Sequence, residues 1–347
     1  MPRPTSDGPA TMLGLAAALP TAFGESFRRG RDAAPPPGRS PPEVVLVGMG
    51  GSGIAAELAR GTVEAETRVR FSVVRSAEMP RYLGPDSHVV LVSYSGNTWE
   101  TLRAYDAAGR AGAQRTVLTS GGALAERAVR DSARLLPIPT GMPPRSAVGH
   151  LLGAILGLLD PYFPESNESR VGRIVERAHR LVREYARPKG PAAVIAERIG
   201  PRMPLMYAES AFLGLARRWK TQVEENAKRL AAFDEVPELF HNAIVGWDAM
   251  RRTEAGRYAA VLLEWSGEHA LLRQSYRYLE RLLARKGVRV VRVPLAAEDR
   301  LEALVDGISL GDHASLFLAD RRRVDPLPVE AIGRLKAVVK GPGLPGH

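Results

Sequence analysis

Two glycine- and serine-rich turns, each placed between a fully apolar run and a helical stretch, most constrain how this chain can fold. GMGGSG at 48–53 follows the apolar run 44–47, and SYSGNT at 93–98 follows the run 88–92. Fully apolar runs are typical of parallel strands covered on both faces, and such strands need helical crossovers between them. The sequence therefore predicts an α/β fold with mostly parallel, doubly wound sheets.

Strands and helices alternate along two halves of the chain. In the first half we expect strands at 44–47, 69–74, 88–92, 116–118 and 135–138, and helices at 54–60, 98–109, 123–130 and 145–159. In the second half we expect strands at 205–208, 259–263 and 288–293, and helices around 219–228, 274–285, 301–318 and 329–339. A chain of 347 residues is comfortable for two domains.

The expected organisation has five parts. Residues 1–42 hold an N-terminal helix over 12–23 and a proline-rich linker, and residues 43–165 form the first α/β domain. Residues 166–190 form a helical connector, 191–325 the second α/β domain, and 326–347 a C-terminal helix. Proline-rich APPPGRSPP within 33–42 is too stiff and too poor in donors for a helix or a central strand.

Composition limits the function classes. The chain is 45% hydrophobic and 25% charged, as in ordinary soluble proteins, and no apolar stretch is long enough for a transmembrane helix. It has no cysteine, which excludes thiolate catalysis and suits a reducing cytoplasm. Lys and Arg exceed Asp and Glu by 48 to 38, but the basic residues are scattered, so we expect no nucleic-acid or membrane partner.

The two turns predict an anion site. Glycines let the backbone approach a ligand, and a helix N-terminus offers unpaired N–H groups to a phosphate. By itself the turn at 48–53 leaves a dinucleotide-binding site open as well. The hydroxyls of Ser93, Ser95 and Thr98 make an uncharged cradle for a phosphate monoester, with Thr98 also a candidate helix cap. A further turn, TSGG at 119–122, should converge on the same crevice.

Other chemistries have little support. No Walker lysine follows the serine-rich turn, and the Gly-Ser-Gly at 51–53 is not the nucleophile elbow of serine hydrolases. The seven histidines are isolated from one another, so we expect no metal site and no cofactor.

With GMGGSG, SYSGNT and TSGG together, the chain resembles a sugar-isomerase (SIS) domain. PPRSA at 143–147, KTQVEENAK at 220–228, His241-Asn242 and DPLPVEAIGRLK at 325–336 narrow the resemblance to the bifunctional phosphoglucose/phosphomannose isomerases. It covers roughly residues 43–340. The resemblance implies two SIS domains and metal-independent aldose–ketose isomerisation of hexose 6-phosphates through a cis-enediolate.

The resemblance also implies roles for four residues. The family's base is a glutamate in an N-E-N context sixteen residues before its histidine, which matches Glu225 before His241, here in E-E-N. Adjacent helical residues point about 100° apart, so only one of Glu224 and Glu225 can face the site. His241 matches a ring-opening histidine supplied across a homodimer interface, Lys336 a lysine at the ring oxygen, and Arg145 the arginine that stabilises the enediolate.

Substrate contacts follow in the same way. Ser93, Ser95 and Thr98 are expected to bind the phosphate, and Gly50, Gly51 and Ser52 to line the sugar. Seven residues before the lysine, Val329 stands where family members carry a threonine credited with leaving room for both carbon-2 epimers. Valine keeps that space and lacks the hydroxyl, so dual specificity remains the main expectation.

Two rival functions remain open. The same cradle serves regulatory modules that sense sugar phosphates, although no helix-turn-helix stretch is evident and a regulator needs no Glu, His and Lys set. An amino-sugar-phosphate isomerase also shares the cradle, and is normally coupled to an amidotransferase half whose usual thiol nucleophile is missing here.

Overall fold

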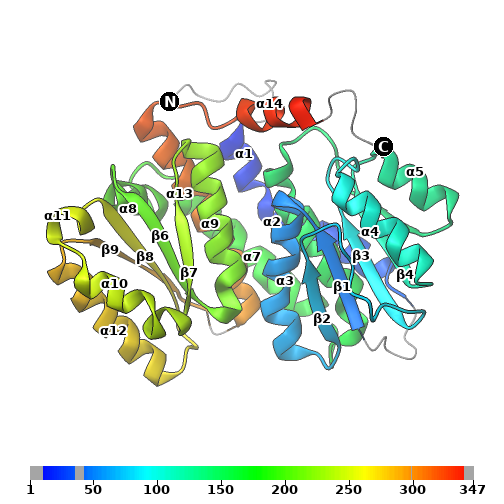
Figure 1. The fold of residues 1–347 in the computed structure, drawn as a ribbon, viewed down its shortest axis with the longest axis horizontal. Coiled ribbons are helices and arrows are strands. Elements are labelled where there is room, and N and C mark those ends of the chain that lie inside the picture. Colours follow the sequence, from blue (N-terminus) through cyan, green and yellow to red (C-terminus); the bar gives the residue numbers. More distant parts are fainter. Residues whose placement is uncertain (1–10, 36–42, 298, 340–347) are drawn as a thin grey trace.

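Two β-sheets, each made of parallel strands, lie side by side in the computed structural model, which describes residues 11–35, 43–297 and 299–339. The side chains of Lys336, Ala337 and Val339 lie outside that description. Every pairing between neighbouring strands in the two sheets is parallel, and helices cover the sheets (Figure 1). The predicted α/β fold class is confirmed.

The first sheet has the strand order β2-β1-β3-β4-β5. Its strands are β1 (Glu43–Gly48), β2 (Arg70–Val74), β3 (Ser87–Val92), β4 (Gln114–Thr119) and β5 (Arg134–Pro137). Its helices are α3 (Gly50–Glu66), α4 (Trp99–Arg110), α5 (Gly122–Arg130) and α6 (Val148–Leu159). All six residues of β3 are buried, as its apolar run predicts. The order of the strands reverses between β1 and β3, which is where open α/β sheets bind ligands.

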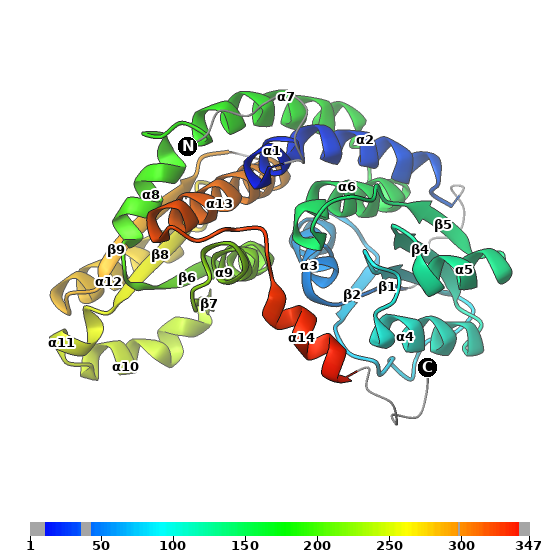
Figure 2. The ribbon, with the colours of Figure 1, turned by 90° about the horizontal axis from the view of Figure 1, so that it is seen from above.

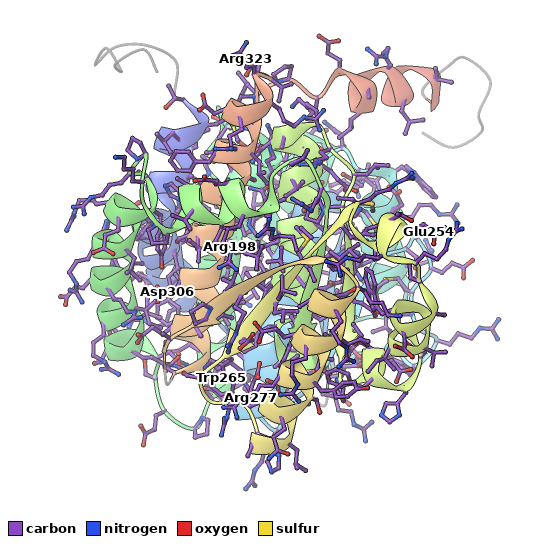
Figure 3. All side chains as sticks on the ribbon, turned by 90° about the vertical axis from the view of Figure 1, so that its left-hand side faces the viewer. Arg198, Glu254, Trp265, Arg277, Asp306 and Arg323 are labelled. Carbon is purple, nitrogen blue, oxygen red and sulfur yellow. The ribbon has the colours of Figure 1, made fainter. Side chains whose placement is uncertain are left out.

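The second sheet repeats this order as β7-β6-β8-β9. Its strands are β6 (Met203–Glu209), β7 (Ala232–Val236), β8 (Tyr258–Trp265) and β9 (Arg289–Leu295). Its helices are α9 (Leu213–Ala227), α10 (Ala243–Ala249), α11 (Arg252–Ala255), α12 (Ala270–Arg285) and α13 (Arg300–Arg322). Figure 3 faces this half and labels Trp265 at the end of β8 and Asp306 on α13.

The N-terminal segment forms two helices, α1 (Met12–Ala17) and α2 (Leu19–Asp32), where one helix over 12–23 was predicted. Pro20 occupies the first turn of α2, where proline is tolerated, so a new helix begins there. α2 packs on α6 at very short range, since a Cβ on Gly153 would lie 2.2 Å from the carbonyl oxygen of Phe23. The glycines of α6 therefore allow the two helix backbones to touch.

The two halves share one continuous hydrophobic core. α3 packs against α9, where a Cβ on Gly214 would lie 2.8 Å from the carbonyl oxygen of Glu57. α7 (Glu168–Tyr185) arches over both halves (Figure 2) and leads into α8 (Pro191–Ile199). Arg170 on α7 donates to Glu66 at 2.6 Å and to Asp299 at 2.6 Å, which joins the end of α3 to the start of α13.

Of the strands in the described residues, only β7 was not predicted. Its sequence, AFDEV, has no apolar run, because β7 is an edge strand of which only Val236 is buried. No helix in the described part of the chain is long and apolar enough to cross a membrane.

Candidate active site

Three turns meet at the carboxyl ends of β1, β3 and β4, as the sequence predicted. The backbone N–H of Tyr94 donates to Ser52 Oγ at 3.1 Å, and Ser120 Oγ donates to the carbonyl of Tyr94 at 2.5 Å. The N–H of Ala123 donates to Asn97 Oδ1 at 3.1 Å. The three turns are therefore cross-linked into one rigid loop cluster around SYSGNT.

Glycine is required inside this cluster. Gly96 has a φ of +66°, and a Cβ there would lie 1.7 Å from the carbonyl oxygen of Gly121. Gly122 has a φ of +73°, and a Cβ there would lie 2.5 Å from the carbonyl oxygen of Ser95. Both the backbone conformation and the space exclude a larger residue.

Gly96→Ala is expected to destabilise the protein by about 1–3 kcal/mol from backbone strain alone, with a further cost from the displaced turn at Gly121. Thermal unfolding should show a lower midpoint, and inorganic phosphate should protect the variant less than the wild type. Gly84→Ala is the matched control, because no atom lies within 4 Å of a Cβ there. Equal midpoints for the two variants would contradict the packing described.

The hydroxyls of the serine-rich turn are arranged to donate. Ser93 Oγ donates to Thr98 Oγ1 at 3.1 Å, and Ser95 Oγ accepts from the N–H of Asn97 at 3.3 Å. Thr98 stands at the N-cap position of α4, as predicted, but its side chain makes no capping hydrogen bond. The hydroxyl protons of Ser95 and Thr98 remain available to a ligand. Two neutral donors at a helix N-terminus suit a phosphate oxygen.

Arg145 connects the glycine-rich turn with the second half of the molecule. It lies in a short 3-10 turn, Pro144–Ala147, and a Cβ on Gly51 would lie 3.5 Å from its Cα. Its side chain is 3% exposed; Nε donates to Asn226 Oδ1 at 2.8 Å, and Nη1 lies 3.4 Å from Glu225 Oε2. Nη2 donates to the carbonyl of Pro326 at 2.7 Å.

The two adjacent glutamates have different partners. Glu224 pairs with Lys220 one turn earlier at 2.7 Å, whereas Glu225 pairs with Arg145. Burial raises the pKa of Glu225, and the nearby guanidinium of Arg145 opposes that rise. A partly buried carboxylate beside a fixed cation can accept a proton from a substrate, and the cation stabilises the negative charge that is left on the substrate.

Arg145 is also held by a buried polar network of α9 and α13 that the sequence did not suggest. Arg218 is 1% exposed, donates to both carboxylate oxygens of Asp312 at 3.0 and 2.6 Å, and donates to the carbonyl of Arg145 at 3.1 Å. Asn226 Nδ2 donates to Ser315 Oγ at 2.8 Å. Arg218, Gln222 and Asn226 are spaced four residues apart on α9, and that spacing was the only available signal for a buried polar face.

A cavity of about 670 Å³ opens between α9 and the C-terminal segment. Thr221, Glu224, Glu225 and Lys228 line it from α9, and Asp325, Pro328 and Val329 line it from the segment that leads to α14 (Glu330–Val339). Both adjacent glutamates therefore border the cavity, contrary to the expectation that only one of them can face the site, and Glu225 is the one that contacts Arg145. Figure 2 shows α14 beginning beside α9 and running between the two halves. Lys336 belongs to α14, and its side chain lies outside the described part of the structure.

His241 lies apart from these residues. It ends the 3-10 turn Glu238–His241 after β7, and it is exposed. Among the hydrogen bonds and ion pairs of the described residues, none joins His241 to Glu225 or Arg145. Within one chain, the structure therefore brings together the predicted Arg145 and Glu225 and leaves His241 on the surface.

The fold and the serine-rich turn together define a protein of the two-domain sugar-isomerase (SIS) class. The tagatose-6-phosphate ketose/aldose isomerase of Escherichia coli has a similar fold, with a TM-score of 0.65 at 18% identity over 92% of this chain and 94% of that one. Residues 188–339 match the family described as bacterial phospho-glucose isomerase C-terminal SIS domain.

Curated relatives identify the family more closely. A bifunctional phosphoglucose/phosphomannose isomerase of Caldicellulosiruptor bescii is 33% identical over 85% of this chain and 88% of its own length. Another from Aquifex aeolicus is 29% identical over 86% of this chain and 90% of its own length. The chain belongs to the bifunctional phosphoglucose/phosphomannose isomerase family.

Proposed function

We propose that the protein interconverts glucose 6-phosphate and mannose 6-phosphate with fructose 6-phosphate, as a cytoplasmic homodimer that needs no cofactor. The observation that carries this proposal is the contact between Glu225 and Arg145 beside the glycine-rich turn. A base and a cation held together at a sugar-phosphate crevice are what proton transfer between adjacent carbons requires. A purely sensing module has no need of a partly buried carboxylate paired with an arginine.

In the proposed reaction Glu225 takes the proton from carbon 2 of the open-chain aldose. The electrons of that C–H bond form the C1–C2 double bond, and the carbonyl oxygen on carbon 1 becomes an oxyanion, which Arg145 stabilises. The carbon-2 hydroxyl then passes its proton to the carbon-1 oxygen, and Glu225 returns its proton to carbon 1. The product is the ketose, with no net change in protons or electrons.

Ser93, Ser95 and Thr98 would bind the phosphate, and Gly50, Gly51 and Ser52 would line the sugar. The hydroxyl protons of Ser95 and Thr98 support this assignment, because phosphate oxygens accept hydrogen bonds. Ser52 Oγ already accepts from Tyr94 and can still donate to a sugar oxygen. Lys336 on α14 would act at the ring oxygen.

The deciding experiment incubates the purified protein with fructose 6-phosphate in deuterated water and EDTA, with the products followed by NMR. Deuterium on carbon 2 of both glucose 6-phosphate and mannose 6-phosphate is expected. If only glucose 6-phosphate appears, the proposal of dual specificity fails, and Val329, which lines the cavity beside Glu225, is the residue to change to Thr. If no hexose phosphate turns over although phosphate binds, the isomerase proposal fails.

The proposed role of His241 across a dimer interface gives a mixing prediction. Glu225→Gln and His241→Ala homodimers should each be nearly inactive. After they are mixed and exchanged, a heterodimer has one site with both changes and one with neither, so about a quarter of wild-type activity should return when subunits pair at random in a two-fold dimer. If activity stays absent although mass spectrometry detects heterodimers, the shared site is excluded.

A further inference from the structure

Lys228 has two contacts that the proposed reaction does not use. It follows the last residue of α9 with a left-handed φ of +55°, a conformation that side chains other than glycine and asparagine adopt infrequently. Its ammonium donates to the carbonyl of Glu225 and, at 3.1 Å, to the carbonyl of Pro326. One side chain therefore joins the end of α9 to the segment that leads into α14.

The same carbonyl of Pro326 also accepts from Arg145 Nη2 at 2.7 Å, and the carbonyl of Leu327 accepts from that nitrogen at 3.1 Å. Two cations thus hold one stretch of backbone against the base-bearing helix. Charged donors make stronger hydrogen bonds than neutral ones, which suits a fixed contact rather than a transient one.

The contact matters because of where the held segment goes. After Arg323, the C-cap residue of α13 that Figure 3 labels, the chain passes Asp325 and Pro326 and enters α14. The stretch 324–332 forms one wall of the cavity, and Glu225 and Lys228 belong to the opposite wall. The apolar side chains of Ile332 and Leu335 on α14 are exposed, so they do little to hold α14 against the rest of the chain. The position of this wall therefore depends on the hydrogen bonds that Arg145 and Lys228 donate to the carbonyls of Pro326 and Leu327.

We propose that Lys228 is a positioning residue of the site: it fixes the backbone at Pro326 against the end of α9 and so keeps the start of α14 at the cavity that Glu225 lines. This inference rests on the proposed isomerase function. The charges around Glu225 are Arg145 from the 3-10 turn and Arg218, Lys228 and Glu224 on or beside α9. Lys228 is one of the cations that lower the pKa of Glu225 against the effect of burial.

The test replaces Lys228 with Met, which keeps the length of the side chain and removes both donors and the charge. Hydrogen exchange followed by mass spectrometry should show faster exchange of the amides in 330–339. The kcat should fall roughly tenfold, because small displacements of positioned groups have effects of this size or larger. The acidic limb of kcat/KM should move to higher pH, because loss of a cation raises the pKa of Glu225.

Two further variants separate positioning from general stability. Arg229→Met is the matched control: Arg229 is the next residue and donates to the carbonyl of Gly200, so its loss should change neither α14 exchange nor the acidic limb. Lys228→Arg keeps a charged donor and should recover most of the kcat. Unchanged exchange and an unchanged limb in Lys228→Met would overturn the proposal. If the wild type turns over no hexose phosphate, the proposed function fails, while the exchange measurement still decides whether Lys228 holds the segment.

Discussion

Glu225→Gln should reduce kcat for fructose 6-phosphate by roughly 10²- to 10⁴-fold, the range expected when a general base is lost. The amide is nearly isosteric with the carboxylate and can still contact Arg145, so KM should change little. Steady-state kinetics, together with solvent deuterium incorporation into carbon 2, measures both effects. Retained wild-type turnover in this variant would exclude Glu225 as the base.

Glu224→Gln is the control that the chain itself offers. Glu224 is the neighbouring residue on the same helix and pairs with Lys220, away from Arg145. Its loss should leave kcat within a few-fold of the wild type, because Glu224 contacts Lys220 rather than Arg145 and helix pairs four residues apart contribute only about 0.3–0.5 kcal/mol. An equal loss of activity in both variants would mean that the change acts through the helix rather than through the base.

The pH profile gives an independent view of Glu225. Because burial raises its pKa, the carboxylate forms only at a higher pH than it would in water, and a base must be ionised to act. We expect the acidic limb of kcat/KM to lie above the ordinary glutamate range. That limb should disappear in Glu225→Gln.

Local sequence patterns were sufficient for most of the fold. Strands such as β3 are fully buried, so their apolar runs stand out, and the turns after β1, β3 and β4 carry the glycines that their backbone needs. β7 escaped prediction because it is a partly exposed edge strand with Asp234 and Glu235 in its centre. α9 begins at Leu213, six residues before the predicted start near Trp219, because its first turns are buried by packing against α3.

The candidate site also has a part that the sequence predicts and a part that it does not. The serine-rich turn is a local motif that the sequence shows directly, whereas the sequence does not show which side of α9 faces Arg145. Adjacent Glu224 and Glu225 differ only in which distant partner they meet, and Glu225 meets a residue 80 positions away. The pairing of Arg218 with Asp312 spans 94 positions and likewise leaves no local trace beyond the four-residue spacing on α9.

Arg145→Met should lower kcat by roughly 10²- to 10³-fold, the scale found when a preorganised group that stabilises an oxyanion is removed. The pKa of Glu225 should rise further, because Arg145 is the strongest of the cations that oppose the effect of burial. The acidic limb of kcat/KM should therefore move to higher pH than in the wild type. Kinetics between pH 5 and 9 would measure both changes.

Arg145 also holds the carbonyls of Pro326 and Leu327, so part of the loss could come from a displaced C-terminal segment. Lys228→Met isolates that part, because it removes the second anchor of Pro326 and leaves the guanidinium in place. The kcat of Arg145→Met should lie well below that of Lys228→Met, and the difference measures stabilisation of the enediolate. Arg145→Lys is a second variant that controls for misfolding, because it keeps the buried charge. A lysine cannot donate to Asn226, Glu225 and Pro326 together, so this variant should fold and still have a low kcat. Equal kcat values for Arg145→Met and Lys228→Met would mean that Arg145 only holds the C-terminal segment and does not stabilise the enediolate.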